Sequence, residues 1–181
     1  MLYEQDLLDC YLALERPLYN VLFRMLWQPQ DCQDVMQQAF LQVWQQREQL
    51  NNTTLAAYIY TVALNLARNR IRWRLNWVFE QLDPWLEQWT GSDVSQQGPA
   101  SPEALLQQQQ QQQLLRRSLS ALPQAEREVL LLTEYSELTL AQTAQVLAIP
   151  AGTVASRRSR ALALLRRQVS LLSKKDVMDA D

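Results

Sequence analysis

The stretch LTLAQTAQVLAIPAGTVASRRSRALALLRR (residues 138–167) decides the fold of this chain. Thr139, with Gln142 three residues later, forms the pattern of a capping box and predicts the start of a helix. Pro150 interrupts this helix because proline lacks the N–H that would continue it. A second helix can begin at about Ala151. Two short helices joined by a tight turn predict a helix-turn-helix motif.

Both predicted helices have an apolar face. In the first, Leu140, Ala144 and Leu147 recur at helical spacing. The second has inward-facing candidates of its own, namely Val154, Ala161, Leu162 and Leu165. The N-terminal half of such a second helix enters the major groove of DNA. The candidate DNA contacts in this half are Thr153, Ala155, Ser156, Arg157, Ser159 and Arg160.

The basic character of this second helix has two interpretations. From Ala155 to Leu172 the sequence holds five arginines and no acid. A charge run of this kind can be the solvated face of an ordinary helical hairpin. Here it follows a capped helix and a tight turn, and arginine can bind two acceptors of guanine at once. The combination favours DNA binding.

The composition predicts an all-α fold. The chain has 181 residues, 48% of them hydrophobic, and only three glycines. This length allows one or two small domains. Acidic and basic residues are separated: residues 1–67 hold seven acids and three bases, whereas residues 68–74 hold four arginines and no acid. Two local basic patches on an acidic body fit a protein that binds DNA through limited surfaces.

Several classes of protein are disfavoured by residues that the chain lacks. It has no histidine, and its two cysteines, Cys10 and Cys32, do not have the spacing of zinc ligands. We therefore expect no metal site, no cofactor and two reduced cysteines in a helical core. Without a Gly-rich phosphate loop or a catalytic constellation, we expect no enzyme and no small-molecule substrate. No signal peptide or membrane span is visible, so the expected location is the cytoplasm.

The N-terminal part of the chain predicts two helices. The first covers residues 1–27, and Pro17 is expected to kink or divide it. The second begins at Asp31, and its face opposite the apolar arc carries Asp34, Gln37, Gln38 and Leu41. Leu41 can be a lone exposed leucine, which needs no explanation. Alternatively, it anchors a docking face for another helix, with the amides as adaptable partners.

A third helix is expected after a polar loop at residues 51–54. It begins apolar at Leu55 and becomes basic over residues 68–74. Arginines interleaved with amides and aromatics suit a nucleic-acid strand, through phosphate contacts and base stacking. Aromatics at helical spacing are nevertheless more often part of a core. The candidates on this helix are Asn65, Arg68, Asn69, Arg72 and Trp73.

The remaining sequence predicts a division into two helical domains. Residues 78–100 lose helical periodicity and contain Pro, Gly and Ser, which indicates a flexible linker. Ser101 and Pro102 start a helix that includes an exposed glutamine run at residues 107–113. Another helix covers residues 124–135. The predicted boundaries are an N-terminal domain at 1–77, a linker at 78–100, a C-terminal domain at 101–173 and a tail at 174–181.

Four stretches in this order resemble bacterial RNA polymerase sigma factors of the extracytoplasmic-function (ECF) class. They are DCQDVMQQAFLQVW (31–44), YIYTVALNLARNR (58–70), LPQAEREVLLL (122–132) and the helix-turn-helix at 138–161. The chain departs from the family pattern at five positions. Ala155 replaces a frequent cation, Arg158 replaces an apolar core residue, and Ala148 stands where a turn glycine is usual. Thr143 and Gln38 also differ. Ala148 is expected to serve if its φ stays negative.

The resemblance implies a function and partners. The helix from Asp31 would dock on core RNA polymerase through Asp34, Gln37, Gln38 and Leu41. The loop with Asn51 and Asn52, together with the third helix, would hold the melted downstream promoter element, and the helix-turn-helix would read the upstream element. An anti-sigma factor would cover both domains and could hold the protein at the inner membrane. The alternative is a stand-alone helix-turn-helix regulator that binds duplex operators. The docking helix and the second arginine cluster argue against this alternative.

Overall fold

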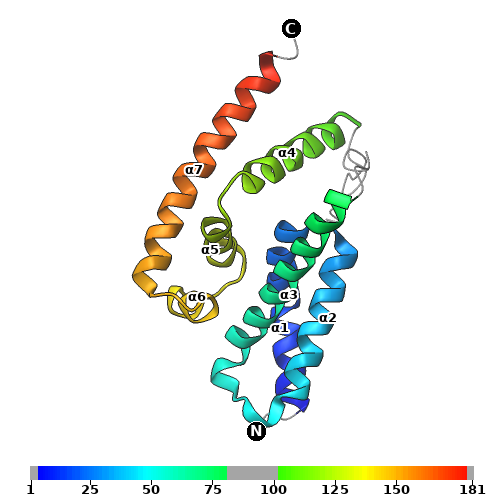
Figure 1. Ribbon diagram of the computed structural model, residues 1–181, viewed down its shortest axis with the longest axis vertical. Helices are drawn as coiled ribbons and strands as arrows, with labels where there is room; N and C mark the ends of the chain where they lie inside the picture. The colour runs from blue at the N-terminus through cyan, green and yellow to red at the C-terminus, as the bar shows by residue number, and fades with distance from the viewer. Residues whose placement is uncertain (1–3, 81–101, 179–181) are drawn as a thin grey trace.

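The computed structural model of the protein describes residues 4–80 and 102–178, and its regular elements within these ranges are all helices (Figure 1). The prediction of an all-α fold is confirmed. The predicted linker lies almost entirely outside the described residues, as does the proposed cap Ser101. None of the described helices is long and apolar enough to cross a membrane. The elements are α1 Glu4–Leu26, α2 Pro29–Gln45, a 3-10 turn Arg47–Gln49, α3 Asn52–Glu80, α4 Pro102–Ser120, α5 Gln124–Tyr135, α6 Leu140–Leu147 and α7 Ala151–Met178.

Helices α1, α2 and α3 pack against one another as a bundle (Figure 1). Each helix places apolar residues at three- and four-residue spacing on its inner side, as in Leu18, Val21 and Leu22 of α1. Pro17 does not divide α1, which is one helix through this position. Pro17 itself is buried, whereas Ala13, whose carbonyl the proline leaves without its helical N–H partner, is exposed to solvent.

Two helix starts in the N-terminal half differ from prediction. α2 begins at Pro29 and not at Asp31, because proline fits the first helical position, where no N–H is needed. The predicted loop at residues 51–54 is wrong, since α3 begins at Asn52. The Oδ1 of Asn51 accepts hydrogen bonds from the backbone N–H of Thr54 at 3.2 Å and from the Thr54 hydroxyl at 2.9 Å. Asn51 is thus the N-cap of α3, whereas the sequence analysis placed it in a loop several residues before the helix.

Helices α5, α6 and α7 pack together, and α4 packs on α7. α5 has the predicted bounds of Gln124–Tyr135, and the glutamine run at 107–113 lies inside α4 as expected. α7 extends to Met178, so the tail predicted from 174 is wrong over its first residues. α3 extends to Glu80, beyond the predicted domain end at 77.

The turn between α6 and α7 has a left-handed residue at its centre. Thr139 caps α6, and its reciprocal capping box with Gln142 is present as predicted. Ala148 ends α6 with φ 52° and ψ 43°, so the condition of a negative φ, under which alanine would serve without strain, is not met. The N–H of Ile149 bonds to the carbonyl of Ala144 at 3.1 Å, which is the pattern of a left-handed helix end. An alanine in this conformation is strained by its Cβ.

Replacing Ala148 by glycine is expected to stabilise the protein by about 1 kcal/mol, because glycine adopts positive φ without the Cβ clash. Ala148 is exposed, so little packing is lost. The expected rise in Tm in a thermal unfolding experiment is about 2–4 °C. Ala141→Gly, in the same helix and also exposed, is the control and is expected to lower Tm. Equal losses in both variants would contradict the left-handed assignment.

Both cysteines are free thiols, as predicted. Cys32 is buried in the bundle and Cys10 is partly exposed. Burial raises the pKa of Cys32 to about 12 and that of Cys10 to about 11. Neither thiol is therefore appreciably ionised near neutral pH, which makes both poor nucleophiles.

Candidate nucleic-acid and polymerase interfaces

The second helix of the motif, α7, presents its N-terminal half to solvent. Val154 and Ala161 are both fully buried, as predicted, and Leu162 and Leu165 are partly buried. Of the candidate DNA contacts, four are exposed and two, Thr153 and Arg157, are partly buried. The exposed four are Ala155, Ser156, Ser159 and Arg160. The predicted contact face is therefore a surface of the molecule.

The buried face of α6 differs from the prediction. Its buried residues are Thr143 and Val146, while Leu140 is 45% exposed. Leu140 is the first residue of the helix. Thr143, which replaces a usual aliphatic residue, has a buried hydroxyl without a hydrogen-bond partner.

Two arginines of α7 bind acids of α5. Arg158 donates from Nε to Glu134 at 2.8 Å, so the long side chain reaches the edge of the α5–α7 contact. An arginine is accommodated at the family's apolar position with its charged end bound to Glu134. Arg160 lies 3.4 Å from Glu126, but its side chain is 71% exposed and remains available to DNA. Arg157 makes no ion pair with any described residue.

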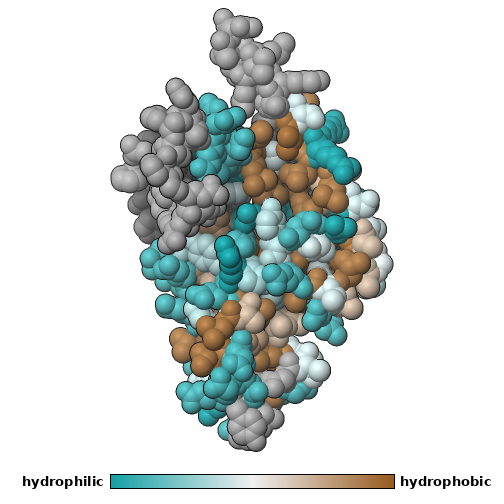
Figure 2. Space-filling view, turned by 180° about the vertical axis from the view of Figure 1, so that it is seen from behind, coloured by the Kyte–Doolittle hydropathy of each residue, from teal (hydrophilic) through white to brown (hydrophobic). Residues whose placement is uncertain are grey.

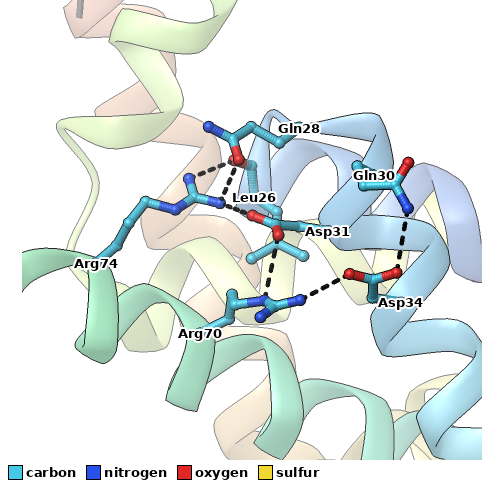
Figure 3. A network of polar contacts seen from close by, with 7 residues as sticks. All are labelled: Leu26, Gln28, Gln30, Asp31, Asp34, Arg70 and Arg74. Atoms are coloured by element: carbon cyan, nitrogen blue, oxygen red, sulfur yellow. Dashed lines mark hydrogen bonds and ion pairs between the residues drawn. The ribbon is translucent and has the colours of Figure 1, made fainter. Parts of the chain in front are cut away.

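Two of the four arginines of α3 hold the N-terminal bundle together (Figure 3). Arg70 pairs with Asp31 at 3.2 Å and with Asp34 at 3.0 Å. Arg74 pairs with Asp31 and donates to the carbonyl of Leu26 at 3.1 Å. These guanidinium groups face α2, so the basic cluster predicted to bind DNA is partly a structural network.

Arg68, a predicted DNA contact, instead pairs with an acid of the C-terminal half. Its Nε and Nη2 donate to the two oxygens of Glu128 at 2.8 and 2.6 Å. The hydrogen bonding of Arg68 to the Glu128 carboxylate is the main cause that raises the pKa of Arg68. Burial opposes ionisation of Glu128, but hydrogen bonds from Arg68 and Gln124 and the nearby positive charges outweigh it and lower the pKa of this carboxyl. Both groups are charged.

The remaining candidates of α3 are exposed. Trp73 is 72% exposed, which excludes the core interpretation for this aromatic. Arg72 is exposed and makes no ion pair among the described residues, and Asn65 and Asn69 are exposed as well. Asn69 and Trp73 line an open groove of about 610 Å³ together with Gln38 of α2. Asn51 is occupied as a helix cap, and the side chain of Asn52 is outside the described part.

The four docking candidates lie on one side of α2 but differ in their neighbours. Leu41 is 60% exposed. Gln37 lies at a second groove, which is formed between α1 and α2 and is lined by Tyr11 and Tyr19 of α1. Asp34 is already engaged by Arg70. Gln38 belongs to the groove shared with α3. Figure 2 shows that exposed apolar side chains gather in groups separated by polar ones.

Some residues with a prominent place in the structure escaped the sequence analysis. Tyr60 is fully buried, and its hydroxyl donates to the carbonyl of Ser136 at 3.0 Å. Arg24 of α1 stacks on the ring of Tyr135, 3.9 Å from its centroid. The position of Glu128 directly before the apolar run at residues 129–132 was one available signal. Within the described ranges, no group of three or more potential ligands could hold a metal ion.

The fold and the exposed basic helix define an all-helical protein of the helix-turn-helix class. Its sequence matches Sigma-70 region 2 over residues 10–75 and Sigma-70, region 4 over residues 112–165. The chain belongs to the sigma-70 family of RNA polymerase sigma factors, in its ECF group.

Relatives and solved structures agree with this assignment. The chain is 27% identical to the ECF RNA polymerase sigma factor SigW of Bacillus subtilis, over 91% of this chain and 87% of that protein. It is 29% identical to the RNA polymerase sigma-E factor of Streptomyces coelicolor, over 81% and 76%. Its fold is similar to the sigma factor RpoE in complex with the anti-sigma factor NepR from Bartonella quintana, with a TM-score of 0.67, 20% identity and coverage of 92% and 96%. CnrH in complex with the cytosolic domain of CnrY gives a TM-score of 0.65 at 18% identity, over 96% of this chain and 91% of that one.

Proposed function

We propose that this sigma factor binds core RNA polymerase through α2 and promoter DNA through α3 and α7, and that it has no catalytic activity of its own. The observation that carries the proposal is the exposed N-terminal half of α7 behind a capped α6. Ser156, Ser159 and Arg160 on this surface can bind base edges or phosphates in a major groove. The expected compartment is the cytoplasm, where bacterial transcription takes place.

We assign the binding of the downstream promoter element to the exposed side of α3. Trp73 can stack on an unpaired base, and Asn69 beside it can form hydrogen bonds in the same groove. Arg72 is free to bind phosphate. Arg70 and Arg74 are left out of this assignment because their guanidinium groups are engaged by Asp31. Melting would then be driven by capture of unstacked bases and not by nucleotide hydrolysis.

The polymerase contact is assigned to Leu41 and Gln37 of α2. A leucine that is 60% exposed on a helix of polar neighbours offers an apolar anchor for a partner helix. Asp34 and Gln38 would contribute at the border, since each also faces α3. An anti-sigma factor is the expected inhibitory partner, because the sigma factor RpoE, which is similar in fold, was solved in complex with the anti-sigma factor NepR.

Run-off transcription with purified bacterial core polymerase on a library of promoter fragments tests the proposal. Transcripts that require this protein and share an upstream and a downstream motif would support it. If the protein alone shifts duplex DNA and no transcripts appear, the stand-alone operator-binding regulator is the better assignment.

Arg157→Ala is expected to weaken binding to upstream-element DNA by about 1–3 kcal/mol and to relax the preference at one base pair.

Arg72→Ala is expected to weaken DNA binding by the same amount for every DNA sequence and to reduce the slope of log affinity against log salt concentration by about one. Fluorescence anisotropy on matched and mismatched duplexes, at several salt concentrations, measures both effects. A uniform loss in Arg157→Ala would contradict a base-reading role.

A further inference from the structure

Two acids of α5 contact arginines in the N-terminal half of α7. The two helices pack against each other (Figure 1). Glu126, in the first turn of α5, has its Oε1 3.4 Å from Nη1 of Arg160. Glu134, near the other end of α5, has its Oε1 2.7 Å from Nη2 of Arg158. Each acid therefore binds one arginine of the helix that is assigned to the upstream element.

The two arginines use different nitrogens for these contacts. Arg158 binds Glu134 through both Nε and Nη2, at 2.8 and 2.7 Å. These two nitrogens form an edge of the guanidinium group that can bind a pair of acceptors at once. Arg160 binds Glu126 through Nη1 alone, and no described residue binds its Nε or Nη2. Arg160 thus keeps open the edge that Arg158 uses within the protein.

The contact between Glu126 and Arg160 joins a buried group to an exposed one. The Glu126 side chain is 11% exposed, whereas that of Arg160 is 71% exposed. The start of α5 favours the negative charge of Glu126, because the N–H groups of the first helical turn are directed toward it. A buried carboxylate has a fixed place, and an arginine bound to it loses part of its rotamer freedom before DNA arrives. Such preorganisation lowers the entropic cost of a defined contact.

We propose that Glu126 is a positioning residue for Arg160: it holds the guanidinium group with its Nε–Nη2 edge toward the bases, and it thereby sets the base preference at one position of the upstream element. This inference rests on the proposed function of α7. Arg158 has no such role, since its edge is bound to Glu134. Without the Glu126 charge, Arg160 can turn to the phosphates, which are the same in every sequence, so DNA is still bound but the preference falls.

The base preference of the holoenzyme, formed by the full-length chain and bacterial core polymerase, measures this role. Each template carries a randomised upstream region that is linked to a barcode in its transcript, and sequencing of the run-off transcripts gives the preference at every position. Glu126→Gln keeps the size of the side chain and removes its charge. Glu134→Gln is the matched control, because it removes the same charge from the same helix but its partner is Arg158.

The position read by Arg160 is the one at which Arg160→Ala loses its base preference. Glu126→Gln is expected to lower the preference at this position by about fivefold, the lower end of what one bidentate arginine–guanine contact contributes. Glu134→Gln should keep the preference at every position. A merely structural role of Glu126 would reduce all transcripts together. An unchanged preference in Glu126→Gln, a loss at other positions, or an Arg160→Ala variant without any position-specific loss would overturn the proposal.

Glu126→Asp is the second variant, and it decides the question if Glu126→Gln loses its helical circular dichroism. It keeps the charge in the first turn of α5, but its side chain is one methylene shorter and cannot maintain the contact with Arg160. The preference at the Arg160 position should therefore fall again, and an unchanged preference would contradict the positioning role. Failure of the proposed function is separate: the wild-type holoenzyme would then give no transcripts, or transcripts without any upstream preference.

Discussion

Leu41→Ala is expected to weaken binding of core RNA polymerase by about 10-fold to 100-fold. Leu41 is 60% exposed in the free protein, so a partner helix would bury most of its side chain. Full burial of a leucine contributes about 1.5–3 kcal/mol, which corresponds to this range of affinity. The substitution should leave folding unchanged, because the side chain lies outside the core. Titration of labelled core polymerase with the variant measures the loss.

Leu171→Ala provides the control for this experiment. Leu171 is a similarly exposed leucine, at 53%, but it lies on α7, far along the chain from the docking helix. Its replacement is expected to change core binding by less than about twofold, since exposed leucines contribute little unless a partner covers them. If both variants bind as tightly as the wild type, Leu41 is a lone surface leucine and the docking face has to be sought elsewhere.

Asp31→Asn is expected to lower the free energy of unfolding by about 2 kcal/mol. Asp31 is 16% exposed and is the shared partner of Arg70 and Arg74 (Figure 3). Without its charge, two guanidinium groups meet without a common counterion beside the first turn of α2. The arginine side chains are 39% and 37% exposed, so water limits the loss to less than that of a fully buried pair. The midpoint of thermal unfolding should fall by about 4–8 °C.

The matched control is Asp34→Asn in the same helix. Asp34 binds Arg70 alone among the arginines and is 38% exposed, so its replacement should cost less than about 1 kcal/mol. Equal effects of the two substitutions would show that Asp31 has no special place in the network. A loss of polymerase binding in Asp34→Asn at unchanged stability would instead support its predicted docking role.

The local structure of this protein followed closely from its sequence. The capping box of Thr139 and Gln142, the bounds of α5 and the inward face of α7 at Val154 and Ala161 were all predicted correctly. These features depend on residues three or four positions apart, and their free energies are set within one helix turn. Errors occurred at helix ends, where Asn51 caps α3 earlier than expected and α7 continues to Met178.

The candidate site was only partly predictable for a physical reason. Sequence alone identified the arginines of α3 as one cluster. It cannot show which of these alternating arginines binds an acid and which stays exposed, because that depends on residues that only the fold brings close. The tertiary structure divides them: Arg70 and Arg74 bind Asp31, Arg68 binds Glu128, and Arg72 stays exposed. An arginine binds whichever acid the fold brings within reach, and the acids here lie 36 to 60 positions away.

The sequence by itself determined the helical class, the helix-turn-helix and the resemblance to sigma factors, since all three depend on local spacing and residue type. Only the tertiary structure decided that Ala148 adopts a left-handed conformation, that Trp73 is exposed and that Glu128 joins region 4 to region 2. The last two features depend on how far-separated helices meet, whereas the first is the local turn that joins α6 to α7. Packing and charge pairing between such segments are set by the whole fold and leave no periodic signal in the chain.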